Sequence, residues 1–228
     1  MSDLKDGSQP HNEYLDVTYG QKAFTEYPFV MTAHLWEKCG LRPGTKLLDL
    51  GCGRGEFLKG FMAKGASGYG FDQSDLAKQQ CPEADIRVGD LEAALPYEDN
   101  YFDVIYSKSV VEHFYYPEKI LAEAHRILKP GGTIITMTPD WKYNVIDFHS
   151  DFTHRTAFTI KAIEDIHKIT GFKNVAGDRF IQLPVYWKHP WTGALIWLAR
   201  NFTPDFMKPK NKFIRFSKEV MLICTATK

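Results

Sequence analysis

Short apolar runs alternate with amphipathic stretches along the middle of the chain. Four runs have the length and composition of buried strands: LLDLG (47–51), GYGFD (68–72), IRVGD (86–90) and FDVIYSK (102–108). Helical stretches follow the first two, one from about Glu56 to Lys64 and one starting near Ser74. Strands that alternate with helices predict a parallel sheet with helices on both of its faces.

The same alternation continues into the second half of the chain. Residues 117–128 repeat apolar positions at helical spacing, KPGG (129–132) predicts a turn, and 133–139 predicts a fifth strand. A helix over about 160–170 has Thr159 as its expected N-cap and Gly171 just after its end. Residues 174–183 and 219–228 predict two last strands. We therefore expect an α/β fold with a doubly wound, mostly parallel, seven-stranded sheet of Rossmann-like type.

Four segments follow from this pattern. We expect an N-terminal tail and helical cover at 1–40, a core at 41–183, an aromatic and basic insertion at 184–218, and a final core strand at 219–228. The first dozen residues are polar and are expected to be disordered.

Composition narrows the class of protein only slightly. Lys+Arg and Asp+Glu number 28 each, so the net charge gives no reason to expect nucleic acid as a partner. The four cysteines are scattered without a metal-site or disulfide pattern, which favours reduced thiols. The start of the chain lacks the apolar stretch of a signal peptide, and no run approaches the roughly 20 residues of a membrane span. The expectation is a cytoplasmic protein.

A glycine loop follows the first predicted strand. LLDLGCGRGEF places Gly51, Gly53 and Gly55 at the first strand-to-helix turn, where doubly wound sheets bind ligands. Asp72 ends the next strand, at the distance where a carboxylate takes ribose hydroxyls, and Asp90 ends the third. A pyrophosphate would be disfavoured by the acid at Asp49. The loop favours a cationic ligand without phosphate over a dinucleotide.

These motifs resemble the core of the class I S-adenosylmethionine-dependent methyltransferases, in their small-molecule branch. The resemblance covers residues 45–140 and includes the D-x-G-x-G-x-G loop, GFDQS, VGDLEAALPYEDNYFDVIYSKSVVEHF and ILKPGG. It implies S-adenosylmethionine as cofactor, S-adenosylhomocysteine as product, and an antiparallel last strand in the sheet.

The resemblance also assigns cofactor-binding residues. Asp49 and the backbone of Gly51, Cys52 and Gly53, with Gly55 completing the loop, would hold the methionine part. Further residues would contact the rest of the cofactor: Asp72 and Gln73 the ribose, Asp90 and Leu91 the adenine, and Ser107 the region beneath the sulfonium. Among the N-terminal aromatic residues (Tyr14, Tyr19, Phe24 and Tyr27), which we expect in a helical cover, Tyr19 is a candidate for the methionine end.

Two histidines are candidates for catalysis. Glu112 and His113 resemble the E-x-x-E-H arrangement of quinone-type O-methyltransferases, which can hold a divalent ion. Ser109 replaces the first acid, so we expect no metal there. His113 could be a base or could hydrogen-bond the loop or the cofactor.

The second histidine lies in DFHSDFTHRTAFT (147–159), which follows the fifth strand and should face the substrate. His154 is a candidate general base for a hydroxyl, since an unperturbed histidine titrates near neutral pH. Arg155 could bind an anionic group of the substrate or pair with Asp147 or Asp151. The spacing of acids and histidines here matches no metal motif, so again no metal is expected.

The insertion has two alternative explanations. WTGALIWLARNF repeats large apolar residues near helical spacing, and a basic segment at 208–218 follows it. Such a segment could be a lid over the substrate pocket, or a peripheral membrane element that admits a lipid-linked acceptor.

The sequence therefore predicts transfer of a methyl group to a small-molecule or lipid-linked acceptor, at oxygen. The alternatives are N-methylation of an amino sugar or small amine, a non-catalytic S-adenosylmethionine-binding partner protein, and a nucleotide-sugar or nicotinamide enzyme. No nucleic acid is expected as substrate.

Overall fold

The computed structural model describes residues 23, 25–205, 207 and 211–228. The chain divides between Tyr97 and Glu98 into two compact units, which are considered one at a time. The predicted disordered tail, and Tyr14, Tyr19 and Phe24, lie outside the described residues.

The first unit carries the glycine loop. Its elements are α2 (Tyr27–Lys38), β1 (Lys46–Leu50), α3 (Glu56–Ala63), β2 (Ser67–Asp72), α4 (Leu76–Gln80) and β3 (Asp85–Val88). The three strands pair in parallel, β1 with β2 and β2 with β3. Helix α2 packs on α3 at Gly60, where an added Cβ would lie 2.2 Å from Thr32 Oγ1. The two helices can pack this closely because residue 60 is a glycine and has no side chain.

The second unit contains the remaining strands. Its elements up to the insertion are β4 (Phe102–Lys108), η1 (Val111–His113), α5 (Pro117–Ile127), β5 (Leu128–Pro139), α6 (Trp141–Asn144), η2 (Phe148–Ser150), α7 (Ile160–Ile169) and β6 (Lys173–Phe180). The last strand is β7 (Met221–Thr227). β4 pairs in parallel with β5, and β7 runs antiparallel to both β5 and β6.

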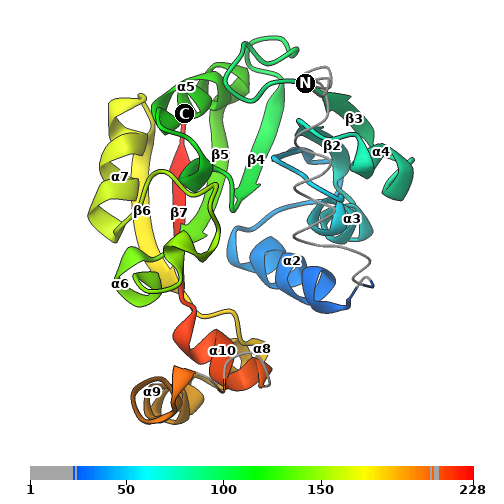
Figure 1. Ribbon diagram of the computed structural model, residues 1–228. Coiled ribbons are helices and arrows are strands. Elements are labelled where there is room, and N and C mark those ends of the chain that lie inside the picture. Colours follow the sequence, from blue (N-terminus) through cyan, green and yellow to red (C-terminus); the bar gives the residue numbers. More distant parts are fainter. Residues whose placement is uncertain (1–22, 24, 206, 208–210) are drawn as a thin grey trace, which may run out of the picture. The chain divides into compact units, whose positions relative to one another are not determined.

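The complete strand order is β3-β2-β1-β4-β5-β7-β6, in one seven-stranded sheet (Figure 1). The predicted fold class is confirmed, including the antiparallel last strand. One local detail differs, because the predicted turn at KPGG belongs to the start of β5. The register between β4 and β5 shifts there, and Gly131 has a φ of 76°, so the residues form an irregular part of the strand.

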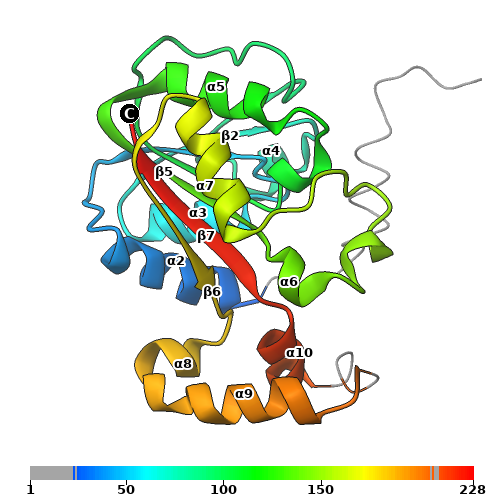
Figure 2. The same cartoon turned by 90° about the vertical axis from the view of Figure 1, so that its left-hand side faces the viewer.

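The insertion forms a group of helices at one edge of the second unit. They are α8 (Pro184–Lys188), η3 (Pro190–Thr192), α9 (Gly193–Phe202) and α10 (Lys212–Lys218). Figure 2 shows α8, α9 and α10 beyond the end of β6 and the start of β7. Pro139, Phe180 and Met221 are register partners there, so the insertion joins the sheet where β5 ends.

Several local predictions are confirmed. Thr159 caps α7 through a hydrogen bond to its Oγ1 from the N–H of Ala162, and Gly171 follows that helix with a φ of 95°. All four cysteines are free thiols. Within the described residues, no helix has both the length and the apolarity needed to cross a membrane.

The core of the second unit contains an ionisable residue, His167 on α7. Its side chain is fully buried, its Nδ1–H donates to the carbonyl of Ile163, and its Nε2 accepts from Thr136 Oγ1 at 2.9 Å. Burial lowers the pKa of His167 to about 4 from 6.5. The folded protein therefore keeps His167 neutral where the unfolded chain already binds a proton.

We predict that His167→Gln flattens the acid limb of the stability curve. In the wild type, His167 contributes stability that is present above pH 6.5 and is lost as the pH falls from 6.5 to about 4. The loss is on the order of 3 kcal/mol. Urea unfolding at about pH 7 and about pH 4.5 should show a smaller drop for the variant. His149→Gln, which changes an exposed histidine, is the control and should keep the wild-type slope. Equal slopes for all three proteins would contradict the prediction.

Candidate active site

The glycine loop of the first unit is tied to the end of β2. The backbone N–H of Gly53 donates to Asp72 Oδ2 at 2.8 Å, and the N–H of Ser74 donates to Oδ1 at 2.9 Å. Gly51, Gly53 and Gly55 all have positive φ values, of 80°, 52° and 78°. Side chains would strain the backbone at these positions, so the loop needs glycine. At Gly53 an added Cβ would meet no atom of the described residues within 4 Å, so among these residues the outer side of the loop is open.

The other predicted residues of this unit lie at the carboxyl ends of the same strands. Gln73 Nε2 lies 3.5 Å from Asp90 Oδ1. This contact links a residue expected to bind the ribose with one expected to contact the adenine. Asp90 is exposed, whereas Asp49 and Leu91 are buried. Burial, with the nearby charges of Asp49 and Asp72, raises the pKa of the Cys52 thiol well above its usual value. Cys52 is therefore a packing residue rather than a nucleophile.

Ser107 is the last residue but one of β4 in the second unit and is only 2% exposed. Its Oγ is buried and has no hydrogen-bond partner among the described residues. A buried hydroxyl without a partner is costly, and a polar ligand atom would offset that cost. This orphaned hydroxyl fits a cofactor-contacting role.

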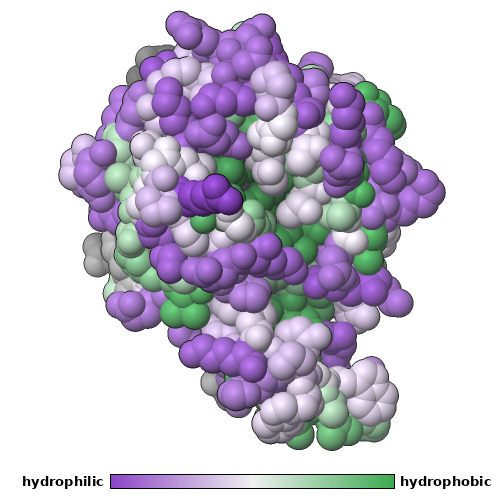
Figure 3. Space-filling view, turned by 180° about the vertical axis from the view of Figure 1, so that it is seen from behind, coloured by the Kyte–Doolittle hydropathy of each residue, from purple (hydrophilic) through white to green (hydrophobic). Residues whose placement is uncertain are grey.

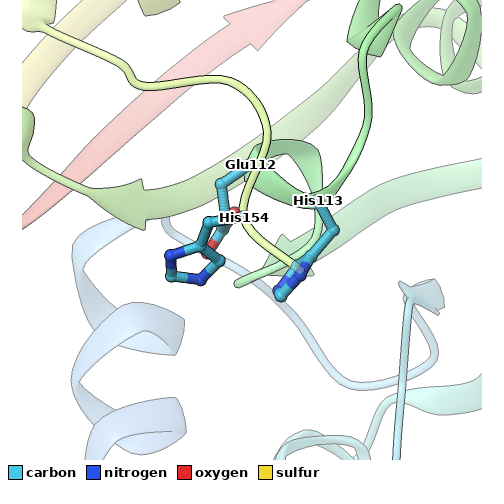
Figure 4. Close-up of side chains that lie close together, drawn as sticks. All are labelled: Glu112, His113 and His154. Carbon is cyan, nitrogen blue, oxygen red and sulfur yellow. The ribbon is translucent and has the colours of Figure 1, made fainter. Parts of the chain in front are cut away.

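The loop at 147–159 is held against the turn that follows β4. The backbone N–H groups of Arg155 and Thr156 both donate to the carbonyl oxygen of Glu112, at 2.7 and 3.0 Å. Thr156 Oγ1 donates to the carbonyl of Phe114 at 2.6 Å. These bonds bring His154 beside Glu112 and His113, and Figure 4 shows the three side chains together. The ring centroids of His113 and His154 are 4.8 Å apart.

Hydrogen bonds assign the tautomer of each histidine. His154 Nδ1 lies 2.6 Å from the carbonyl of Phe148, which can only accept, so Nδ1 carries the proton. Thr153 Oγ1 donates to Asp151 Oδ1 at 2.6 Å and therefore accepts from His113 Nδ1, 2.8 Å away. In neutral form both rings consequently keep their Nε2 lone pairs for a proton. Asp151 Oδ2 lies 4.0 Å from His154 Nε2 and would stabilise an imidazolium there.

Burial shifts the pKa values of Glu112 and His113, the other two residues of the cluster. Glu112 is 0% exposed, its Oε2 accepts from Thr138 Oγ1 at 3.0 Å, and its Oε1 is buried without a hydrogen-bond partner among the described residues. Desolvation raises the pKa of Glu112 from 4.5 to about 7. Desolvation, followed by the neighbouring His154, lowers the pKa of His113 from 6.5 to about 4. His113 is thus a neutral, weak base at physiological pH.

The cluster could also hold an ion after rearrangement. Glu112, His113 and His154 offer ligand atoms that lie within 4.8 Å of one another. Two ligands at about 2.1 Å from one ion are about 3.0–3.4 Å apart, so a metal would require the loop to close further. The expectation of no metal stays a prediction.

The contacts of Arg155 suit the binding of an anionic group rather than the uptake of a proton. It is exposed, its Nη1 donates to the carbonyls of Phe152 and His154, and its guanidinium lies 5.5 Å from the centroid of the Tyr115 ring. These contacts leave most of its five N–H donors available to an anionic group.

Sequence analysis named Asp151 only as a possible partner of Arg155, and it did not predict the contact of Thr138 or the docking of the loop on the Glu112 carbonyl. Thr153, Asp151 and Thr138 orient or contact the three members of the cluster, and the Glu112 carbonyl holds the loop. Thr153 stands beside His154 in the sequence, which is the only signal that could have identified it.

Comparison with known proteins gives a methyltransferase match. Residues 48–136 match the family model described as a methyltransferase domain. Over that region the chain is similar to S-adenosylmethionine-dependent methyltransferases. The cofactor of this family is S-adenosylmethionine, and the open glycine loop, Asp72 and the orphaned Ser107 hydroxyl fit it.

Three curated relatives illustrate the similarity. A 37.1 kDa protein in a transposon of Streptomyces fradiae is 34% identical over 146 residues, 59% of this chain and 41% of that protein. The ubiquinone biosynthesis O-methyltransferase of Maricaulis maris is 33% identical over 109 residues, 43% of each chain. Phosphoethanolamine N-methyltransferase 2 of Caenorhabditis elegans is 32% identical over 147 residues, 59% of this chain and 34% of the relative. The matched part of the chain thus spans between 34% and 43% of the length of these three relatives.

Solved structures of the family share the fold. A SAM-dependent methyltransferase from Archaeoglobus fulgidus aligns with a TM-score of 0.65 at 19% identity, over 96% of this chain and all of the other.

We predict that Asp72→Ala weakens S-adenosylmethionine binding by about 10²-fold. The carboxylate is expected to bind the ribose while it holds the glycine loop, and hydrogen bonds to charged groups are worth about 1.5–3 kcal/mol each. Calorimetric titration measures the affinity, and thermal unfolding checks that the variant folds. Asp75→Ala, at a nearby exposed acid, should bind as the wild type does. Unchanged affinity in Asp72→Ala would overturn the ribose assignment.

We also predict that Glu112→Gln changes the alkaline limb of stability. Because the pKa of Glu112 is raised on folding, its contribution is present below pH 4.5 and is lost as the pH rises through about 7. The loss is on the order of 3 kcal/mol, and glutamine avoids it. Relative to wild type, the variant should gain stability between about pH 5 and about pH 8 in urea unfolding. Glu98→Gln, at an exposed position, is the control. Parallel curves for Glu112→Gln and wild type would contradict the assignment.

Proposed function

We propose that the protein transfers a methyl group from S-adenosylmethionine to an oxygen of a small-molecule or lipid-linked acceptor. The observation that supports this most directly is the histidine cluster beside the loop at 147–159. In its neutral form His154 keeps the Nε2 lone pair for a proton, and Asp151 lies 4.0 Å from that atom. A hydroxyl acceptor needs such a base, whereas the cofactor-binding residues alone would bind the methyl donor without activating the acceptor.

In this proposal the two units have separate tasks. Asp49 and the glycine loop hold the methionine part of the cofactor, Asp72 with Gln73 the ribose, and Asp90 with Leu91 the adenine. Ser107 contacts the region near the sulfonium. When bound there, S-adenosylmethionine would supply a methyl group that its sulfonium already activates. As the acceptor oxygen bonds to this methyl group, the C–S bond would break and S-adenosylhomocysteine would leave. Positioning therefore supplies much of the rate.

The second unit acts on the acceptor. His154 Nε2 takes the hydroxyl proton, and Asp151 stabilises the imidazolium that forms. His113 stays neutral and faces the acceptor as a hydrogen-bonding group, since its pKa is lowered to about 4. Arg155, which is exposed at the same loop, binds an anionic group of the acceptor.

A nitrogen acceptor is the second candidate. Relatives of the chain include a phosphoethanolamine N-methyltransferase as well as a ubiquinone biosynthesis O-methyltransferase. A neutral amine already carries the lone pair that attacks, so its methylation would depend much less on His154 as a base. A protein that binds the cofactor without turnover is the third candidate, and it would show binding alone.

Labelling of a host lysate tests the proposal. Purified protein and S-adenosylmethionine with a radiolabelled methyl group are added to the lysate, which is then split into lipid-extractable, small water-soluble and macromolecular fractions. Label in either of the first two fractions, in a product that mass spectrometry identifies as an O-methyl compound, is the expected result. Label on nitrogen would favour the second candidate. Cofactor binding without any label would favour the third.

We predict that His154→Ala slows this transfer by about 10²–10⁴-fold, the usual contribution of a general base. Cofactor affinity should stay at the wild-type value, because His154 belongs to the acceptor side. His149→Ala, which removes an exposed histidine of the same loop, should keep the wild-type rate. A wild-type rate in His154→Ala would make the loop a scaffold.

A further inference from the structure

Helix α9 carries its large apolar side chains on the outside. Trp191, in the preceding turn η3, and Leu195, Leu198 and Phe202 are 71%, 50%, 47% and 71% exposed. Their spacing of four, three and four residues places them along one side of a continuous helical stretch. Trp197, at the flank of this stripe, is 57% exposed. Figure 3 shows hydrophobic and pale aromatic side chains gathered over the end of the unit that α9 forms.

The opposite side of α9 faces the protein. Ile196 is 1% exposed, and Arg200 points inward. The Nε of Arg200 donates to the carbonyl of Ser217 on α10 at 2.7 Å, and its guanidinium lies 4.5 Å from the centroid of the Tyr143 ring. A surface helix of a globular protein normally buries its apolar stripe and exposes its charges. In α9, by contrast, most of the large apolar side chains are exposed and the charged Arg200 faces the protein.

The segment of the sequence that contains this stripe is rich in positive charge. Residues 184–219 contain seven lysines and arginines (Lys188, Arg200, Lys208, Lys210, Lys212, Arg215 and Lys218) against two acids, Asp205 and Glu219, so the net charge is 7 − 2 = +5. The whole chain has a formal net charge of 0, so the charge is concentrated in this segment. Two ion pairs neutralise part of it, Lys218 with Asp205 and Arg215 with Glu219.

We propose that the exposed side of α9 (Trp191, Leu195, Leu198 and Phe202) binds the surface of a membrane that contains anionic lipids. Tryptophan and other large apolar residues enter the headgroup boundary, while lysine and arginine contact the lipid phosphates. Charge favours this occupant over a second copy of the chain, because a symmetric pair would bring two segments of net charge +5 together. The helix lies in the membrane plane in this arrangement.

The consequence for the rest of the second unit follows from connectivity. The insertion joins β6 and β7 at the edge where β5 ends, and Arg200 contacts Tyr143 of α6, which leads into the loop at 147–159. Docking of α9 would bring this edge close to the lipid. The docking itself does not depend on methyl transfer, so it can be tested in protein that has no known acceptor.

Co-sedimentation with vesicles tests the proposal. The intact protein is mixed with vesicles of phosphatidylcholine, with and without phosphatidylserine. The expected result is binding to the vesicles that contain phosphatidylserine, and weaker binding as salt is raised. Leu198→Ser should lower the affinity at least about tenfold, since burial of one leucine is worth roughly 1.5–3 kcal/mol. Trp191→Ser should have a similar effect.

A matched control separates this face from general surface hydrophobicity. Ile169 on α7 is 78% exposed, and Ile169→Ser should bind vesicles as the wild type does. Circular dichroism and thermal unfolding verify that each variant folds. Failure of the intact protein to sediment with anionic vesicles would overturn the proposal. So would wild-type binding by the α9 variants. Self-association in solution that Leu198→Ser abolishes, without vesicle binding, would assign the face to a second copy instead.

Discussion

The histidine cluster of this protein depends on one backbone interaction, the docking of the loop at 147–159 on the carbonyl oxygen of Glu112. Two consecutive N–H groups, of Arg155 and Thr156, donate to that single oxygen. The loop thereby pairs with the turn after β4 although 42 residues separate Thr156 from Phe114 in the sequence. Every feature of the histidine cluster follows from this docking, because it sets the distance from His154 to His113 and Glu112. Backbone bonds suit this task, since they are independent of the side chains that must face a substrate.

Burial then decides the chemistry of the docked residues. Desolvation disfavours charge, so it raises the pKa of Glu112 and lowers that of His113. Asp151 lies 4.0 Å from His154 Nε2, so in our proposal His154 is the residue of the cluster that takes the proton. In the first unit, burial likewise raises the pKa of the Cys52 thiol, so this thiol is not a nucleophile. The two units therefore differ in kind: the first presents backbone donors and carboxylates, and the second presents an imidazole base.

The insertion shows what the spacing of residues in a sequence leaves undecided. Apolar residues at helical spacing in 191–202 are equally compatible with a lid over a pocket and with a surface element. The direction in which the stripe faces depends on what packs on the other side. Arg200 settles this locally through Ser217 and Tyr143, two partners 17 and 57 residues away along the chain. Long-range contacts of this kind leave no mark in a window of a dozen residues.

The sequence by itself determined the strands, most of the helices, the sheet class and the glycine loop. These depend on local causes: the alternation of apolar runs, the φ values that Gly51, Gly53 and Gly55 must adopt, and the hydroxyl of Thr159 at a helix start. The place of the Asp72 carboxylate beside the glycine loop could be predicted because the end of a parallel strand has a fixed place in such a sheet. Only the tertiary structure decided how His113 and His154 meet, which tautomers they adopt and why Glu112 is buried. It also decided which side of α9 is exposed. Those properties arise from contacts between residues far apart in the chain and from burial, and neither is a property of any single segment.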